Sequence, residues 1–313
     1  MEKSANNTEA TCVDFPHGPA KGWYKIAFDR EVEPGVSAWR IGAKRLMLVR
    51  EGDQIRAFNG DCPHRGAELG RGWILNGNAV VCPFHHYAIK LGTGSGLCVQ
   101  EYQVAQIANM VLISLTEDSR FDLIEKFNDL LSEHQLVEAL TIRVKAPMSL
   151  IIENAFDFKH FFGVHGVQMK ETGTFDRKEG GLGAKATMMV PYQQREPGGP
   201  VIPEPTPTSY DCIAYSPGLT WIMLGGVNPY GVITGACDLG GGYCDVRLTF
   251  VLPRDQWPDG FPKERLEPLT NYSRKGLMDD QEVWENMRLD LAPQWMPEDE
   301  GIRIWHEFCR GFA

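Results

Sequence analysis

The sequence predicts an α+β protein built from two parts, a small all-β domain and a larger domain in which an antiparallel sheet packs against helices. Three observations support this prediction. Short strand patterns separated by turn residues fill the first third of the chain, one amphipathic segment follows them, and longer strand patterns then lead to a final helical region. With 313 residues the chain is long enough for two separate hydrophobic cores.

The first domain is expected at residues 19–118, after a polar, flexible tail at residues 1–18. Its strand patterns are short, rich in β-branched and aromatic residues, and closely spaced. They lie at Ala38–Ile41, Arg45–Arg50, Gln54–Phe58, Ala79–Val81 and Val111–Leu115. Many short strands at this spacing are typical of a small β domain.

An amphipathic segment at residues 119–134 separates the two domains. Its apolar residues recur at helical spacing among Asp, Glu, Lys and Asn side chains, and they are Phe121, Ile124, Phe127, Leu130 and Leu131. We therefore expect a connector helix here, with its apolar side packed on the protein core. The second domain is expected at residues 119–313, this helix included.

The second domain continues with a strand pattern at Leu140–Lys145 and a helical pattern at Leu150–His165. Further strand patterns lie at Ala184–Pro191, Tyr210–Tyr215, Leu219–Gly225, Val232–Cys237 and Tyr243–Pro253. The Pro- and Gly-rich segment Gln193–Thr208 is expected to form a long loop that can cover a pocket. Because Lys263–Leu291 returns to a helical pattern, the order predicts a curved antiparallel sheet that grips a long C-terminal helix.

Composition argues against several classes of function. The net charge is −10 and no basic arm is visible, so we expect no nucleic-acid partner. No apolar run approaches the length of a membrane span, and residues 1–16 lack the apolar core of a secretory signal. The eight cysteines do not form a disulfide framework and fit a reducing compartment, so we expect a cytoplasmic protein.

Two short hooks each combine one Cys with one His. They are Cys62-Pro-His64 and Cys82-Pro-Phe-His85, separated by seventeen residues. Structural zinc hooks usually pair Cys with Cys and His with His, whereas two thiolates on one iron and two imidazoles on the other describe a Rieske [2Fe–2S] cluster. We predict that these four residues bind such a cluster. The spacing favours His85 over the adjacent His86, which we expect to be a surface or interface residue.

A second group of candidate ligands follows about eighty residues later, with Asp157, His160 and His165. Two histidines after a carboxylate can form the start of a mononuclear iron site. Asp157 and His160 share one face of a helix, and His165 can approach them if the helix bends or unwinds near Gly163. A further carboxylate from another part of the chain would complete the ligand set.

Taken together, these motifs resemble those of the Rieske non-haem iron oxygenases. The resemblance covers roughly residues 20–313. Cys62–Gly70 and Cys82–His85 resemble the cluster loops of the family, and Gly22–Tyr24 resembles its N-terminal strand. Glu153–His165 resembles the catalytic iron motif, and Asp280–Asn286 resembles the segment that supplies the third ligand. Arg303–Phe308 resembles the closing helix of the 3-ketosteroid 9α-hydroxylase-like branch. For the second domain the resemblance implies a helix-grip (START-like) fold.

The resemblance also implies roles for individual residues. His160, His165 and Asp280 would bind the mononuclear Fe(II), and spacing alone leaves Asp279 as an alternative to Asp280. Asp157 would lie between His160 and a cluster histidine of a neighbouring subunit in a homotrimer. Asn154 would contact oxygen or substrate, although Asn at a helix start is often only a cap.

The activity implied is that of a terminal oxygenase component. A separate reductase, with or without a ferredoxin, would supply electrons from NAD(P)H, and O2 would be used to hydroxylate a mid-sized apolar substrate such as a steroid, terpenoid or natural-product scaffold. Monooxygenation is favoured, while dioxygenation, desaturation and dealkylation remain open. The alternative is a Rieske electron-transfer protein whose helix-grip module binds a lipid.

Some apolar residues can be interpreted either as substrate-pocket lining or as ordinary core. They are Phe156, Phe161, Phe162, Trp221 and Met223. The glycine clusters at Gly225-Gly226 and Gly240–Gly242 fall in strand-turn regions, so they indicate β-turns and not a nucleotide-binding loop.

Overall fold

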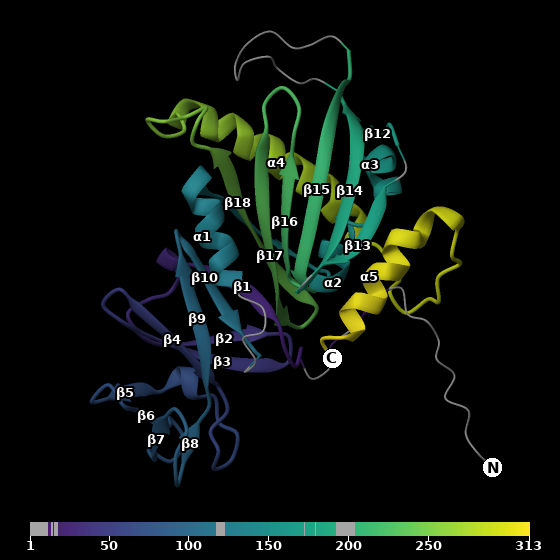
Figure 1. Ribbon diagram of the computed structural model, residues 1–313. Coiled ribbons are helices and arrows are strands. Elements are labelled where there is room, and N and C mark those ends of the chain that lie inside the picture. Colours follow the sequence, from purple (N-terminus) through teal and green to yellow (C-terminus); the bar gives the residue numbers. More distant parts are fainter. Residues whose placement is uncertain are drawn as a thin grey trace, which may run out of the picture.

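The computed structural model describes residues 12–13, 15, 18–116, 123–171, 173–178, 180–191 and 204–313. Most of the predicted tail lies outside these residues, as do Phe121 and residues 193–203 of the predicted loop. Figure 1 shows a small β part formed by the first third of the chain, beside a larger part in which helices accompany a long-stranded sheet. The predicted α+β architecture is confirmed.

The N-terminal part contains two sheets. Six strands, in the order β1-β10-β9-β4-β3-β2, form the larger sheet, and β5-β6-β7-β8 form the smaller one. The strands are β1 (Trp23–Phe28), β2 (Gly35–Ile41), β3 (Lys44–Glu51), β4 (Gln54–Asn59), β5 (Trp73–Leu75), β6 (Ala79–Val81), β7 (Ala88–Leu91), β8 (Cys98–Val99), β9 (Glu101–Ile107) and β10 (Met110–Ser114), with short 3-10 turns at Asp29–Glu31 and Leu69–Arg71. Their alternating apolar side chains build the core between the sheets.

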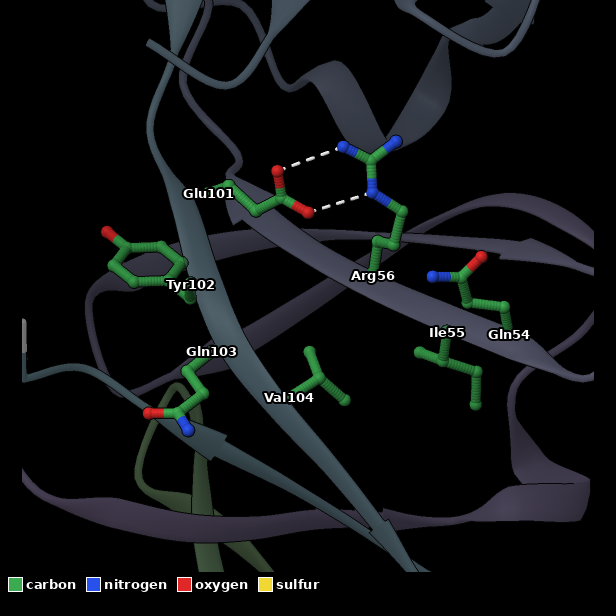
Figure 2. A pocket seen from close by; sticks show the side chains of 7 residues that line it. All are labelled: Gln54, Ile55, Arg56, Glu101, Tyr102, Gln103 and Val104. Carbon is green, nitrogen blue, oxygen red and sulfur yellow. Dashed lines mark hydrogen bonds and ion pairs between the residues drawn. The ribbon is translucent and has the colours of Figure 1, made fainter. Parts of the chain in front are cut away.

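Strands β4 and β9 separate beyond a short paired stretch, and a surface groove lies between them. Pairing joins Ala57 to Tyr102 and Phe58 to Glu101. Figure 2 shows that Arg56 and Glu101 bridge the groove, with two hydrogen bonds of 2.8 and 2.9 Å. The bidentate geometry makes this a strong surface contact, so it braces β4 just before the chain enters the first Cys–His hook.

The larger part contains one eight-stranded sheet. Its order is β11-β18-β17-β16-β15-β14-β12, and β13 also pairs with β14. The strands are β11 (His134–Val144), β12 (Gln168–Met169), β13 (Thr174–Lys178), β14 (Gly181–Val190), β15 (Thr206–Ser216), β16 (Leu219–Leu224), β17 (Tyr230–Gly240) and β18 (Tyr243–Pro253). The helices are α1 (Leu123–Glu133), α2 (Met148–Glu153), α3 (Phe158–His165), α4 (Lys263–Trp284) and α5 (Glu300–Arg310), with a 3-10 turn at Pro297–Asp299.

The two faces of this sheet have different neighbours. Figure 1 shows α4 crossing behind the long strands, whereas α1 lies near the small β part. Trp221 of β16 stacks on Phe127 of α1 at 6.1 Å, and the next residue along the strand, Ile222, packs with the core that includes Leu277 of α4. Alternation along β16 therefore places Trp221 on the face opposite α4.

The helix predicted at Leu150–His165 is wrong in one respect, because it consists of two helices. Asp157 has φ −91° and ψ 88°, outside the helical range, and its side chain caps the start of α3. The break therefore comes before His160 instead of near Gly163. The helix predicted at Lys263–Leu291 is α4, and it ends earlier, at Trp284. Just beyond it, the Glu285 carboxylate accepts the main-chain N–H of Lys145 at 2.9 Å.

Close contacts fix the small β part against the larger sheet. Lys25 of β1 is fully buried, and its Nζ donates to the carbonyl oxygen of Arg247 at 3.1 Å and to Thr249 Oγ1 at 2.7 Å. A Cβ added at Gly235 of β17 would lie 2.6 Å from Lys25 Cβ. The absence of a side chain at Gly235 therefore allows the two sheets to approach each other.

Candidate metal centres

The two Cys–His hooks fold in the same way. The N–H of Cys62 donates to Ala67 and its carbonyl oxygen accepts from Gly66, at 2.8 and 2.7 Å. In the second hook the N–H of Cys82 donates to the carbonyl oxygen of Tyr87 at 2.9 Å, and the carbonyl oxygen of Cys82 accepts the N–H of His86 at 3.0 Å. Gly66 and His86 occupy equivalent positions and both have left-handed φ, +70° and +57°. This equivalence explains the place of His86 as part of the turn.

Main-chain N–H groups are directed at both cysteine sulfurs. They come from the second and third residues after each cysteine. Burial raises the pKa of the Cys62 thiol, and the neighbouring Cys82 raises it further. Burial also acts to raise the pKa of Cys82, but its two N–H partners and Cys62 lower it on balance. Because N–H donors favour the thiolate, which is the form that binds iron, the pair fits one iron of a cluster.

The two histidines of the hooks lie beside each other at the surface. The ring centroids of His64 and His85 are 4.8 Å apart. Both imidazoles are exposed, whereas Cys62 and Cys82 are only 3 % and 1 % exposed. The hooks therefore offer two buried sulfurs and two outward imidazoles, the donor set that a Rieske cluster requires.

A second donor set lies between α3 and α4. Ligand atoms of His160, His165 and Asp280 all lie within 4.8 Å of one another, and His165 Nε2 is 3.2 Å from Asp280 Oδ1. Asp280 Oδ1 is buried and accepts no hydrogen bond from the described residues. An orphaned carboxylate oxygen facing two imidazoles fits a bound cation, and two His with one carboxylate is the facial set of non-haem Fe(II).

Asp157 caps the start of α3 and orients His160 in two ways. The Asp157 carboxylate accepts the main-chain N–H groups of Lys159 and His160 at 3.0 and 3.2 Å. The His160 Nδ1–H donates to the main-chain carbonyl oxygen of Asp157. The contact from this imidazole is therefore to the carbonyl and not to the carboxylate, and it leaves Nε2 as the atom available to a metal. Burial lowers the pKa of His160, which favours the neutral form.

The structure distinguishes the two adjacent aspartates of α4. Asp279 points outward and forms an ion pair with Lys275 at 2.6 Å, one helical turn earlier. Asp280 is 8 % exposed and faces the two histidines. Side chains on adjacent helical positions point about 100° apart, so only one of the two can face α3. This arrangement favours Asp280 as the third ligand.

Asn154 lies at the end of α2, where its Oδ1 accepts from Trp284 Nε1 of α4 at 3.3 Å. It therefore links the end of α2 to α4, the helix that carries Asp280. Two further contacts at the turn between α2 and α3 were not predicted from the sequence. Tyr210 OH donates to the carbonyl oxygen of Ala155 at 2.9 Å, and the His306 imidazole hydrogen-bonds to the Glu153 carboxylate. The resemblance of Arg303–Phe308 to a closing helix indicated a helix there, but it gave no signal for the contact between His306 and Glu153.

Several apolar side chains are only partly covered on α4 and on the face of the sheet toward α4. They are Ala186, Val190, Ile222, Leu224 and Val232 on the strands and Leu277 on α4. For Trp221 and Met223, packing on the α1 side favours the interpretation as core over that as pocket lining. Phe156 is core, 1 % exposed and stacked on Trp305 at 5.0 Å.

Comparison with known proteins assigns the first donor set to a family. Residues 22–110 match the model of the Rieske [2Fe–2S] domain. Over 74 residues the chain is 36% identical to ferredoxin CarAc of Metapseudomonas resinovorans, a match that covers 23% of this chain and 68% of the ferredoxin. The chain therefore belongs to the Rieske [2Fe–2S] proteins.

A further relative is the carnitine monooxygenase oxygenase subunit of Escherichia coli K12. It is 38% identical over 76 residues, which are 23% of this chain and 20% of that subunit. The match thus spans about a fifth of this relative's length.

Two solved structures extend the comparison to most of the chain. Dicamba monooxygenase bound to 3,6-dichlorosalicylic acid has a TM-score of 0.66 at 17% identity, covering 94% of this chain and 97% of that one. NdmA of Pseudomonas putida CBB5 with caffeine has a TM-score of 0.66 at 15% identity, covering 92% and 89%. Identities this low indicate a shared fold. On this fold, the first donor set fits a [2Fe–2S] cluster and the second fits a mononuclear non-haem iron.

Among the described residues, no helix combines the length and apolar character needed to cross a membrane.

Proposed function

We propose that the chain is the terminal oxygenase component of a Rieske non-haem iron oxygenase system. The observation that carries the proposal is the presence of two different donor sets in one chain, a Cys2His2 set with exposed imidazoles and a partly buried His2Asp set. When bound, the cluster supplies single electrons and the mononuclear iron activates O2. We assign the cluster to residues 19–118 and the iron to residues 119–313.

The residues around the iron would divide the work of holding and orienting it. His160, His165 and Asp280 would be its ligands and leave positions for O2. The carbonyl of Asp157 sets the tautomer of His160. The second carboxylate oxygen of Asp157 would accept an imidazole N–H of a neighbouring subunit, and Asn154 would face oxygen or substrate from the end of α2.

The proposed substrate is a mid-sized apolar molecule such as a steroid, terpenoid or natural-product scaffold. The partly covered apolar side chains on the face of the sheet that α4 covers support this, because they offer apolar contacts to a substrate. Resemblance to the 3-ketosteroid 9α-hydroxylase-like branch is the basis for preferring hydroxylation by a monooxygenase. The name of a related protein, the cholesterol 7-desaturase of Drosophila melanogaster, keeps desaturation as an alternative, and dealkylation and dioxygenation stay open as well.

The proposed partners are a reductase, with or without a ferredoxin, and two further copies of the chain. Large apolar side chains are exposed around the hooks, with Phe84 61 % and Trp73 48 % exposed. Others are exposed on the helices of the second donor set, with Met278 57 % and Phe162 54 % exposed. Two such patches on different parts of one chain suit a head-to-tail contact, which closes into a ring. A homotrimer of this kind would bring the hooks of one subunit to α3 of the next.

Analysis of iron and acid-labile sulfide tests the proposal. After reconstitution with Fe(II) we expect three irons and two sulfides per chain, since the cluster holds two of each and the second site one iron. Two irons with two sulfides would contradict the oxygenase and support the alternative, a Rieske electron-transfer protein with a lipid-binding helix-grip module.

A further inference from the structure

A buried carboxylate–imidazole pair lies behind the turn between α2 and α3. Glu153 at the end of α2 is 7 % exposed and His306 of α5 is 2 % exposed. His306 Nε2 lies 2.6 Å from Glu153 Oε2. Burial raises the pKa of Glu153, while the hydrogen bond to His306 opposes that rise. Neither side chain belongs to the two donor sets.

Main-chain hydrogen bonds connect this pair to the iron site. The carbonyl oxygen of Glu153 accepts the N–H groups of Phe156 at 2.8 Å and Asp157 at 3.0 Å, which closes the turn. Asp157 then caps α3 with its carboxylate and holds the imidazole of His160 with its carbonyl. A continuous series of hydrogen bonds therefore leads from His306 to His160.

Helix α5 is itself held firmly against the turn. Trp305 Nε1 donates to the carbonyl oxygen of Ser149 at 2.9 Å. Gly301 lies so close that an added Cβ would be 2.1 Å from the carbonyl oxygen of Phe156. A helix packed this tightly gives His306 a fixed position, from which it can restrain the Glu153 side chain.

Stability alone is a weak explanation for such a pair. Replacing a buried ion pair by apolar side chains of similar volume often leaves stability unchanged or improves it. In contrast, hydrogen bonds outside the ligand shell orient metal-binding imidazoles and strongly affect metal affinity.

We propose that Glu153 and His306 are positioning residues for the mononuclear iron site, whose hydrogen bond holds the α2–α3 turn so that His160 faces the metal. This inference rests on the iron site proposed above. It predicts that metal affinity depends on the hydrogen bond itself and not on the filling of the core.

Metal affinity of the full-length protein, with its cluster intact, tests the inference. The mononuclear iron is removed with a chelator, and Co²⁺ binding is measured by competition with a fluorescent chelating dye. Glu153→Met keeps the length of the side chain but removes the acceptor, and we expect about 10–100-fold weaker Co²⁺ binding. Glu153→Gln keeps an oxygen that accepts from His306, and we expect its affinity within about threefold of wild type.

The double variant Glu153→Met/His306→Leu separates positioning from stability. It leaves no buried polar group of the pair unpaired, so its melting temperature should return toward the wild-type value. We expect its Co²⁺ affinity to stay as low as in Glu153→Met. Recovery of affinity together with the melting temperature would overturn the positioning role.

Lys25→Met serves as the matched control. This variant removes a buried polar side chain and its two hydrogen bonds at the contact between β1 and β18, away from the donor set. We expect a lower melting temperature and unchanged Co²⁺ affinity, whereas an equal loss of affinity would show that binding follows general stability and would overturn the inference. Failure of the wild type to bind Co²⁺ would instead contradict the proposed iron site.

Discussion

The two donor sets are built in opposite ways. The cluster set comes from two short turns that main-chain hydrogen bonds close within six residues, Cys62–Ala67 and Cys82–Tyr87. The iron set needs α3 and α4, two helices far apart in the sequence that meet on one face of the sheet. Local turns can present ligands at the surface, whereas a partly buried site between two helices depends on tertiary packing. Changes in the turns should therefore act locally, and changes near the iron should act through the fold.

The largest expected effect is at the iron set. Asp280→Ala removes the one carboxylate of the set, and we expect loss of the mononuclear iron and at least about 100-fold lower turnover, the upper end of what changes outside the ligand shell cause. Asp279→Ala is the matched control, because it removes a neighbouring carboxylate that pairs with Lys275 at the surface. Iron content and turnover are measured for both variants. Loss of iron in Asp279→Ala with full iron in Asp280→Ala would reverse the assignment.

The cluster set should respond with a lower redox potential or with loss of the cluster. His64→Cys or His85→Cys replaces a neutral imidazole by a thiolate, which stabilises the oxidised cluster. We expect the reduction potential to fall by on the order of 100 mV or more, in the direction of all-cysteine clusters, or the cluster to be lost. Protein-film voltammetry measures the potential. An intact cluster with an unchanged potential would show that the replaced histidine is not a ligand.

Asp157 tests how the two sets communicate. Asp157→Asn keeps a side chain that caps α3 but removes its charge. We expect the cluster and the mononuclear iron to remain bound and the cluster to be reducible, while turnover falls about 10–100-fold. Asp157→Ala should in addition cost about 1 kcal/mol of folding free energy through loss of the cap.

Mixed assemblies show whether the electron crosses between chains. Subunits carrying Asp157→Asn are combined with subunits that lack the cluster, so that some contacts pair an intact Asp157 with an intact cluster of the neighbour. Partial recovery of turnover is expected if the ring is correct. An active monomer, or no recovery in demonstrably mixed rings, would contradict transfer between subunits.

The smallest expected effect is at His86. Its left-handed φ of +57° matches that of Gly66 in the other hook. His86→Gly relieves about 1–2 kcal/mol of backbone strain and loses about 0.4–1 kcal/mol through the greater freedom of the unfolded chain. We therefore expect a gain of between zero and about 1.6 kcal/mol in the free energy of unfolding, with an unchanged cluster spectrum. Chemical denaturation measures the free energy of unfolding. Loss of the cluster spectrum in this variant would show that His86 is a ligand.

Sequence reasoning predicted the local features well. The hooks were predicted from spacing alone, and β18 has the predicted bounds, Tyr243–Pro253, because alternating apolar residues and adjacent turns delimit it. The Leu150–His165 pattern did not reveal the break at Asp157, since apolar residues continue on both sides of it. The choice between Asp279 and Asp280 also required the structure, because only the packing of α4 shows which side chain points inward.

One measurement tests the central claim most directly, namely that one chain holds both a Rieske cluster and an accessible Fe(II). The reduced protein is treated with nitric oxide and studied by electron paramagnetic resonance. We predict two signals of equal spin concentration, one from the reduced cluster and one from the nitric oxide adduct of the mononuclear iron. A full cluster signal with no adduct signal, after reconstitution with Fe(II), would contradict the account.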